Sequence, residues 1–399
     1  MSETASTPAR ALDGIRVLDV TQVMAGPFCA MQLCDMGAEV IKVEPPGGDS
    51  TRRMAGAAGQ DSATFNAVNR GKRGIVLDLK RAEARAAFRR VARRCDILIE
   101  NYRPGVMRDF GLDYQTLAAD HPGLIYASIS GYGASGPDAG KGGFDLVAQG
   151  ASGIMSVTGE PDGRPVKAGL PVTDLGAGLF ALAGILAALH YRSRTGCGQY
   201  LDTSLLEAGV ALSVWEATEY FATGRVPQPM GSAHRMSAPY QAIRCADGYI
   251  TLAAANDRLF VRLCTLLGHP EWATHDDYCD DTHRVRNRGT LATLIESVTL
   301  TQPRAYWLHL FGEHDLPCGP INNYEQVFHD PQVCARAMVV STMHPTLGPI
   351  QTLGSPLKMS VTPPIAGRPA PRLGEHTAEV LREAGCDAET IAALVPAAR

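Results

Sequence analysis

The chain has 399 residues, 45% of them hydrophobic and 20% charged, a composition typical of a globular protein large enough for two domains. Its formal net charge of −4 argues against a nucleic-acid-binding protein, because such proteins carry a positive excess on one face. The ten cysteines are scattered without a C-x-x-C pair, and the first residues lack the pattern of a signal peptide or anchor, so we expect reduced thiols and a cytoplasmic location.

The first part of the chain alternates predicted strands and helices. Strands are predicted at 14–20, 39–46, 73–79, 96–101 and 123–133, with helices at 28–38 and 80–95. Such alternation is typical of parallel strands joined by crossover helices, so we predict an α/β fold. Ligands of such folds bind at the carboxyl ends of the strands.

The segment 225–241 is rich in Pro, Gly and Ser and predicts a linker before a second domain that starts near Tyr240. Beyond it we expect a hairpin at 242–255, helices at 258–268 and 288–300, a strand at 338–343 and a last helix ending at Gly385.

An apolar helix is predicted at 175–189, with Asp174 at its head. Thr173 and Asp174 both stand where an N-cap is expected, and the carboxylate of a cap accepts the free amide hydrogens of the first turn. The same position also suits a reactive carboxylate kept ionised by the helix dipole, with Gly176 and Gly178 letting other groups approach. The apolar run is shorter than the ~20 residues that a bilayer requires, so we expect a buried helix and no membrane partner.

Two patterns have ordinary explanations, and two common enzyme motifs do not occur. Gly131–Gly136 matches G-x-G-x-x-G, but Pro137 follows it where a dinucleotide-binding helix would have to begin, so we expect a surface loop. Residues 275–283 contain His, Cys and Asp without the spacing of a zinc module, and we expect a solvated loop and no metal. The sequence lacks G-x-S-x-G and Walker motifs, which argues against serine hydrolases and phosphate-loop enzymes.

Two short stretches indicate a ligand. Arg70, Lys72 and Arg73 lie in a turn bounded by glycine, where cations can reach phosphate groups. Asn101 and Tyr102 follow a predicted strand, which is where α/β proteins hold ligands.

Ordered motifs along nearly the whole chain resemble the family III CoA-transferases, the CaiB/BaiF family that includes formyl-CoA transferase and α-methylacyl-CoA racemase. They are "LDGIRVLDVTQVMAGP", "GAEVIKVEPPGGD", "NRGKRGIVLDLK", "ENYRPGV", "GYGASGP", "GFDLVAQGASG", "TGCGQYLDTSLLEA", "APYQAIRCADGYI", "CGPINN" and "LGEHTAEVL". The resemblance implies a Rossmann-like large domain built from both chain ends, a smaller α+β middle domain and an interlocked, ring-like homodimer. On this basis we expect the large domain at 1–205, a helix and linker at 206–239, the small domain at 240–320 and a return to the large domain at 321–399.

The resemblance also implies the residues of the site. Asp174 matches the family's nucleophile, which forms a covalent intermediate with the acyl-CoA. The family carries Arg where this chain has Asp109, with Arg108 one position earlier. The expected CoA-binding residues are Gln22, Val23, Met24, Ala25, Lys72, Arg73, Asn101, Tyr102 and Arg108. Acyl-CoA and a small carboxylic acid are the expected substrates, and no permanently bound cofactor is expected.

At two places the chain departs from particular members of the family, and these differences narrow the expected activity. Racemases of this superfamily carry His directly before Asp145, where this chain has Phe144, which cannot move a proton. Formyl-CoA transferases have a glycine-rich lid and a glutamine near the carboxylate, where this chain has residues 229–240 and Met24. We therefore predict a CoA-transferase that works through aspartyl anhydride and aspartyl-CoA thioester intermediates. Racemase or epimerase chemistry and a non-catalytic CoA-binding protein are the alternatives.

The substrate acids are expected to include a small dicarboxylic species such as that of succinyl-CoA. Arg52, His234 and Arg235 lie in loop-like segments, where they can pair with a distal carboxylate. Phe144 is expected beside the substrate.

Overall fold

The computed structural model describes residues 10–54 and 62–395 of the chain. They form two compact units. Unit 1 contains the chain up to Ile154, Lys167–Trp215 and the chain from Pro331 onward, and unit 2 contains Met155–Val166 and Glu216–Asp330. Unit 2 thus includes the whole range 240–320, and both ends of the described chain belong to unit 1.

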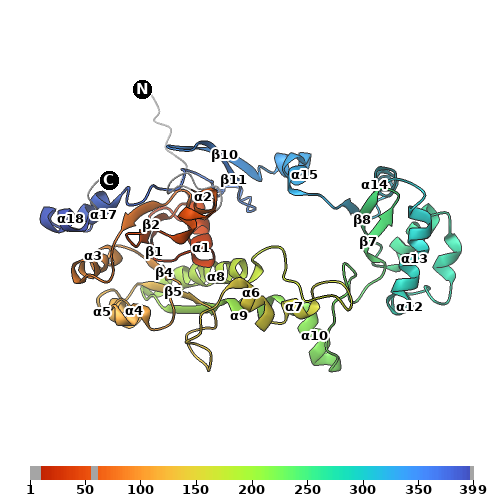
Figure 1. Cartoon of the computed structure of the whole chain (residues 1–399), viewed down its shortest axis with the longest axis horizontal. Helices are drawn as coiled ribbons and strands as arrows, with labels where there is room; N and C mark the ends of the chain where they lie inside the picture. The colour runs from red at the N-terminus through yellow and green to blue at the C-terminus, as the bar shows by residue number, and fades with distance from the viewer. Residues whose placement is uncertain (1–9, 55–61, 396–399) are drawn as a thin grey trace. The chain divides into compact units, whose positions relative to one another are not determined.

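Unit 1 is built on a six-stranded parallel sheet, which confirms the α/β prediction (Figure 1). Its strands are β1 (Arg16–Asp19), β2 (Glu39–Glu44), β3 (Arg73–Val76), β4 (Ile97–Glu100), β5 (Ile125–Ser130) and β6 (Tyr200–Ser204). The strand order is β3-β2-β1-β4-β5-β6, as in doubly wound α/β sheets. The order reverses direction between β1 and β4, and such a switch point opens a crevice at the carboxyl ends of the strands.

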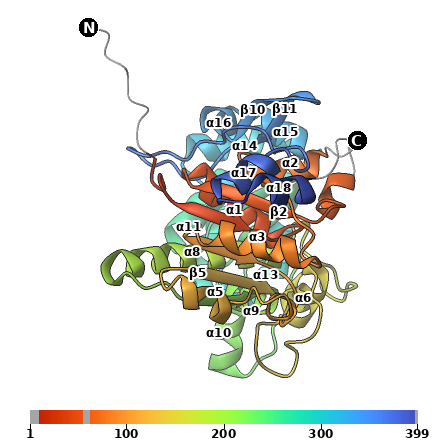
Figure 2. The same cartoon turned by 90° about the vertical axis from the view of Figure 1, so that its left-hand side faces the viewer.

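Helices cover both faces of this sheet because successive strand residues point to opposite sides. On one face, Leu18 and Ile75 join a core with α3 (Ala82–Ala92), α4 (Val106–Asp109), α5 (Tyr114–Asp120), α17 (Thr377–Glu383) and α18 (Ala388–Leu394). On the other face, Val17 and Ile97 join a core with α1 (Ala25–Asp35), α6 (Asp145–Ala151), α8 (Val172–Thr195) and α9 (Leu205–Leu212). Figure 2 shows α17 next to α18 and close to α3, so the C-terminal helices complete a layer begun by the first third of the chain.

Helix α8 is longer than the sequence predicts. It continues past His190 and Arg192 to Thr195, and by length and composition it could cross a membrane, so the expectation of a run too short for a bilayer is wrong. Buried residues on one side pack on α1, β5, β6 and α9, as the prediction of a buried helix requires. On the other side Leu179 and Phe180 are exposed.

The remaining elements of unit 1 come between β2 and β3 in the chain or follow unit 2. They are η1 (Ser50–Arg53), α2 (Ala63–Asn69), α16 (Pro331–Ala335) and the antiparallel pair β10 (Val339–His344) and β11 (Gly348–Leu353). After β5 the next helix is α6, which begins at Asp145, so the glycines at 131–136 lie in a loop as predicted, although Gly133 is buried within it.

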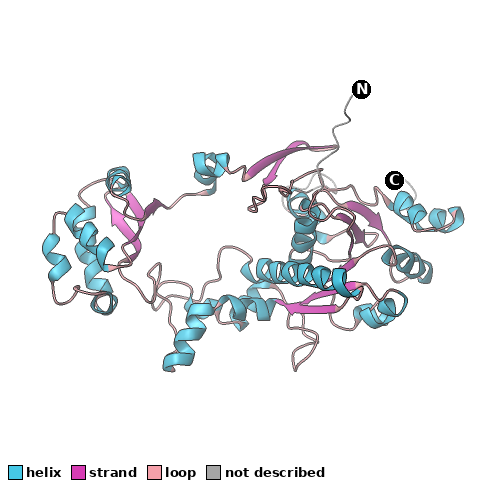
Figure 3. Ribbon diagram, turned by 180° about the vertical axis from the view of Figure 1, so that it is seen from behind, coloured by secondary structure: helices cyan, strands magenta, loops and turns pink. Residues whose placement is uncertain are grey.

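Unit 2 has a three-stranded antiparallel sheet flanked by helices (Figure 3). The predicted hairpin is present as β7 (Tyr240–Cys245) and β8 (Gly248–Ala253), and β9 (Cys318–Pro320) adds an edge. Its helices are α11 (Asp257–Leu266), η2 (Pro270–Thr274), α12 (Asp281–Arg286), α13 (Arg288–Thr299), α14 (Arg304–Glu313) and α15 (Tyr324–His329). Two helices, α7 (Ile154–Val157) and α10 (Val214–Thr223), lie where the chain passes between the units.

Candidate active site

A cavity of about 340 Å³ opens at the switch point of the sheet. Its walls come from the segments that follow β1, β4 and β5 and from the first turn of α8. The lining residues are Gln22, Val23, Met24, Ala25, Asn101, Tyr102, Arg103, Pro104, Ile129, Ser130, Gly131, Lys141, Gly142, Gly143, Phe144, Asp174 and Leu205. The structure therefore brings together eight of the residues singled out in the sequence, from four separate stretches of the chain.

Asp174 stands in the first turn of α8 but does not cap it. The N-cap position belongs to Pro171, two residues before Thr173. Asp145, the first residue of α6, accepts a 3.0 Å hydrogen bond from the Thr173 backbone nitrogen and one of 2.8 Å from its hydroxyl. The N-cap interpretation of Asp174 is therefore wrong, because another acid already performs that task.

The pKa of Asp174 is raised to about 6, first by burial and then by the nearby charge of Asp145. This shift is opposite to the effect of a helix dipole, which would keep the carboxylate ionised. Burial removes the water that stabilises the anion, and a neighbouring carboxylate repels it. Asp174 is therefore a more basic carboxylate than an exposed aspartate. Most molecules carry it as an anion only above about pH 6.

Glycines allow the walls of the cavity to approach one another. A Cβ atom on Gly178 would lie 2.7 Å from the Ala25 carbonyl oxygen, so only glycine lets α8 come this close to α1. A Cβ on Gly131 would lie 2.7 Å from the Gly143 Cα, so these two glycines pack backbone against backbone. The second contact folds the loop after β5 back on itself and places Lys141 at the cavity.

Asn101 and Tyr102 both connect to the turn between β1 and α1. The Gln22 backbone nitrogen donates to Asn101 Oδ1 at 2.9 Å, and Asn101 Nδ2 donates to the Gln22 carbonyl at 2.8 Å. The Gln22 side chain also forms a hydrogen bond with Tyr102, whose pKa is nevertheless raised by burial. The two strand ends of the switch point are thus joined directly.

Three cavity residues bear on substrate recognition. Phe144 is 75% exposed and lines the cavity, and its place beside a substrate stays a prediction. The cations Arg103 and Lys141 also line the cavity, although neither was among the residues expected from the sequence. Lys141 is 2.7 Å from Asp138 in the same exposed loop. Their position after strand ends was the only signal in the sequence that could have found them.

The basic turn is not an open phosphate cradle, and that expectation is corrected. The Lys72 amine is buried and lies 2.7 Å from the carboxylate of Asp19 at the end of β1. Arg73 forms ion pairs with Glu39 on β2 and with Glu379 and Glu383 on α17. Both cations therefore form ion pairs inside unit 1, because carboxylates of neighbouring strands and helices lie within bonding distance of them.

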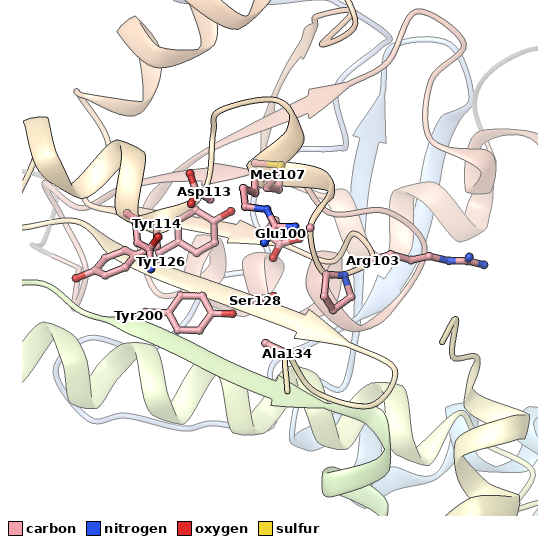
Figure 4. A pocket seen from close by; sticks show the side chains of 13 residues that line it. Glu100, Arg103, Met107, Asp113, Tyr114, Tyr126, Ser128, Ala134 and Tyr200 are labelled. Atoms are coloured by element: carbon pink, nitrogen blue, oxygen red, sulfur yellow. The ribbon is translucent and has the colours of Figure 1, made fainter. Parts of the chain in front are cut away.

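Arg108 lines a second cavity, of about 600 Å³. Figure 4 shows this cavity from close by, with Tyr114, Tyr126 and Tyr200 among its lining residues. The rings of Tyr114, Tyr126 and Tyr200 gather there with centroids 5.8 to 6.2 Å apart. Glu100 also lines this cavity; burial raises its pKa to about 7, and its Oε2 accepts a 2.8 Å hydrogen bond from the Tyr102 backbone nitrogen. Arg103 lines both cavities, so the two are neighbours along one chain segment.

Arg52 is not available to a substrate, contrary to expectation. It is 1% exposed, its Nε lies 2.7 Å from Glu44, and its guanidinium stacks 3.6 Å above the Phe65 ring. In unit 2, His234 stacks on Tyr240 with ring centroids 4.9 Å apart, and Arg235 lies 3.4 Å from Glu219. The roles expected for these two residues stay predictions.

One group in unit 2 has the donor types of a metal site. Cys279, Asp280 and His283 offer ligand atoms within 4.8 Å of one another. Asp280 Oδ1 accepts from the His283 backbone at 2.9 Å and lies 2.8 Å from His283 Nδ1, so it caps α12. This capping bond accounts for the arrangement without an ion.

Comparisons with known proteins agree on one family. The family described as CoA-transferase family III matches residues 12–377. A succinate–glutarate CoA-transferase of Agrobacterium fabrum is 42% identical over 380 residues, which cover 93% of this chain and 95% of that one. A succinyl-CoA:mesaconate CoA-transferase of Haloarcula hispanica is 41% identical, over 94% of this chain and 96% of that one. The crystal structure of a CaiB/BaiF family protein from Brucella suis superimposes with a TM-score of 0.83, at 38% identity, over 94% of this chain and 99% of that one.

Proposed function

The chain belongs to CoA-transferase family III and is an acyl-CoA:carboxylate CoA-transferase, and we propose that it moves CoA from succinyl-CoA to a small dicarboxylic acid with Asp174 as the nucleophile. The single observation that carries the assignment to Asp174 is the shared cavity. Asp174 faces the turn after β1 and the strand end after β4, which are the segments expected to bind CoA.

In the proposed first half-reaction, the Asp174 carboxylate attacks the thioester carbonyl, and a C–O bond replaces the C–S bond. The released CoA thiolate then attacks the aspartyl carbonyl of the mixed anhydride. A new C–S bond forms, the anhydride C–O bond breaks, and the donor acid leaves as a carboxylate. The result is an aspartyl-CoA thioester on Asp174.

The second half-reaction reverses these steps with the acceptor acid. Its carboxylate attacks the aspartyl thioester to give a second anhydride and free CoA thiolate. The thiolate attacks the acceptor carbonyl, which yields the new acyl-CoA and restores the Asp174 carboxylate. Each tetrahedral intermediate carries an oxyanion, and the amide groups at the start of α1, where Ala25 lines the cavity, are suited to stabilise it.

The proposal of dicarboxylic substrates rests on two observations. The relatives named above act on succinate, glutarate or mesaconate according to their names. In this chain, Lys141 and Arg103 place positive charge at the cavity that contains Asp174. A cation of this kind can hold the distal carboxylate while the reacting carboxylate meets Asp174.

We also propose that the enzyme works as an interlocked homodimer. In unit 1 the outer side of α8 and the adjoining helix α9 expose large apolar side chains, among them Leu179, Phe180, Val210 and Leu212. A second copy of the chain would remove this surface from water. Size-exclusion chromatography with serial dilution tests the proposal, and a folded monomer at low concentration would overturn it.

The experiment that tests the function combines exchange and trapping. Purified enzyme is incubated with acyl-CoA donors and a panel of carboxylic acids, and the new acyl-CoA is measured by chromatography. Hydroxylamine is then added to enzyme and donor alone, and peptide mass spectrometry locates the hydroxamate. Transfer of CoA with the hydroxamate on Asp174 is the expected result. Binding of CoA without exchange would instead indicate a non-catalytic CoA-binding protein, and trapping at another residue would remove Asp174 from the mechanism.

A further inference from the structure

The turn between β1 and α1 contains a valine in a backbone conformation that favours glycine. Val23 has a φ of 68°, and its side chain is 38% exposed and lines the cavity that holds Asp174. A β-branched residue is disfavoured in this left-handed region because its Cβ crowds the backbone. Such a conformation persists only where the surroundings hold it in place, and it is found mainly at functional sites.

Asn101 holds the turn on the side that precedes Val23. Its amide oxygen accepts from the Gln22 nitrogen at 2.9 Å, and its amide nitrogen donates to the Gln22 carbonyl at 2.8 Å. This pair of bonds fixes the orientation of both peptide groups of Gln22, and therefore the direction in which the chain enters Val23.

Asp49 holds the turn at Val23 itself. The Val23 nitrogen donates to Asp49 Oδ2 at 3.3 Å, and the Lys42 amine lies 3.1 Å from the same oxygen. Lys42 also donates to the Thr21 carbonyl at 2.8 Å. Burial alone would raise the pKa of Asp49, but Lys42 lowers it overall, so Asp49 remains an anion that accepts hydrogen bonds.

We propose that Asn101 and Asp49 are positioning residues that clamp the β1–α1 turn with Val23 in the left-handed conformation, so that the turn presents its backbone to the acyl-CoA beside Asp174. The inference rests on the proposed CoA transfer. Each end of the Asn101 amide already binds Gln22, so Asn101 acts through the turn. The resemblance predicts instead that Asn101 touches CoA, and the two roles have different consequences.

A double-mutant cycle separates these roles. Asn101→Leu removes both bonds at similar side-chain volume, and kcat/KM should fall about 100-fold, the effect expected from a small misplacement of a binding element. Adding Val23→Gly to the Asn101→Leu variant should raise kcat/KM again by at least about tenfold, because glycine adopts positive φ without a clamp. The single variant Val23→Gly supplies the reference. A double variant no more active than Asn101→Leu would overturn the clamp, because a lost contact with CoA cannot be restored at residue 23.

Hydrogen exchange gives a readout that does not depend on activity. Peptides spanning 20–28 should exchange faster in Asn101→Leu than in the wild type. Asn287→Leu is the matched control, because Asn287 donates a 3.0 Å bond to the Asp277 carbonyl in unit 2. The Asn287→Leu variant should leave hydrogen exchange at 20–28 unchanged, and adding Val23→Gly to it should not raise its kcat/KM. If the leucine variant does not fold, Asn101→Asp keeps the acceptor, loses the donor and carries the same expectations.

The two proposals fail in different ways. A wild-type enzyme that transfers no CoA would overturn the proposed function. Unchanged exchange at 20–28 in the Asn101 variant would overturn the clamp, whatever the activity of the wild type.

Discussion

Asp145 accepts hydrogen bonds from both the backbone nitrogen and the hydroxyl of Thr173, at 3.0 and 2.8 Å. The first turn of α8 is thereby held by a side chain from α6, and the next residue, Asp174, lines the cavity. The residue that orients the helix also bears a negative charge, so it contributes to the raised pKa of Asp174 after the larger effect of burial. Capping of α8 and the basicity of the proposed nucleophile are therefore linked through Asp145.

The raised pKa of Asp174 should make the stability of the fold depend on pH. The pKa of Asp174 in the folded chain, about 6, lies above its ordinary value of 3.8, so its proton stabilises the fold at low pH and this contribution is lost as pH rises through 6. Asn at this position stays neutral. The free energy of unfolding of Asp174→Asn, relative to that of the wild type, should therefore be higher at pH 8 than at about pH 4. The expected increase is on the order of 1 kcal/mol, a modest figure because the side chain is partly exposed. Denaturant unfolding at both pH values measures the gain, and an equal difference at both would contradict the prediction.

The second prediction concerns the pH dependence of the rate. The proposed nucleophile is the carboxylate, so kcat/KM should fall about tenfold per pH unit below about pH 6, the pKa of Asp174. Enzyme returned to neutral pH after each measurement serves as the control for acid unfolding. A rate that stays constant down to about pH 4 would show that Asp174 does not titrate in the rate-limiting step.

Arg52 should determine stability and not substrate affinity. Arg52→Ala leaves Glu44 buried without its ion pair and removes the stacking on Phe65, so unfolding free energy should drop by about 3–5 kcal/mol. The neighbouring exposed Arg53 provides the control, and Arg53→Ala should change stability by less than about 0.5 kcal/mol. A stable Arg52 variant with a raised KM for dicarboxylates would restore the substrate role that the sequence suggested.

Lys141 should favour dicarboxylic substrates. Lys141→Ala removes a cation from the cavity, so KM for succinate or glutarate as acceptor should rise by about fivefold, in keeping with a single partly exposed ion pair. KM for a monocarboxylate of the same length should not change. Lys358→Ala, at an exposed lysine outside the cavity lining, is the control. Equal changes for both classes of acid would argue against contact with a distal carboxylate.

Phe144 leads to a prediction about the alternative chemistry. A phenyl ring cannot accept a proton, so incubation of the enzyme with a 2-methylacyl-CoA in heavy water should introduce no deuterium beside the thioester. Mass spectrometry of the recovered thioester measures this. Incorporation at a rate comparable with CoA transfer would favour racemase or epimerase activity.

The local pattern of the sequence was sufficient to predict the secondary structure around the site. β-branched runs and helical spacing predict β1, α1 and β2, the hairpin of β7 and β8, and the helix behind Asp174, because the side-chain periods of strands and helices are local properties. The position after a predicted strand also singled out Asn101 and Tyr102, since parallel strands share one carboxyl edge, whereas Gln22–Ala25 and Phe144 were expected from the family resemblance.

The tertiary structure alone decided which charged and polar groups line the cavity and which form buried ion pairs inside the protein. Lys72 and Arg52 are cations in apparent loops, yet Asp19 and Glu44 reach them from adjacent strands and neutralise them in the core. Asp174 occupies a helix start that predicts a lowered pKa, yet burial and Asp145 raise it. In each case the deciding group belongs to another helix or strand, and the free energy of a charge depends on its distance to other charges and to water, which only the folded chain defines.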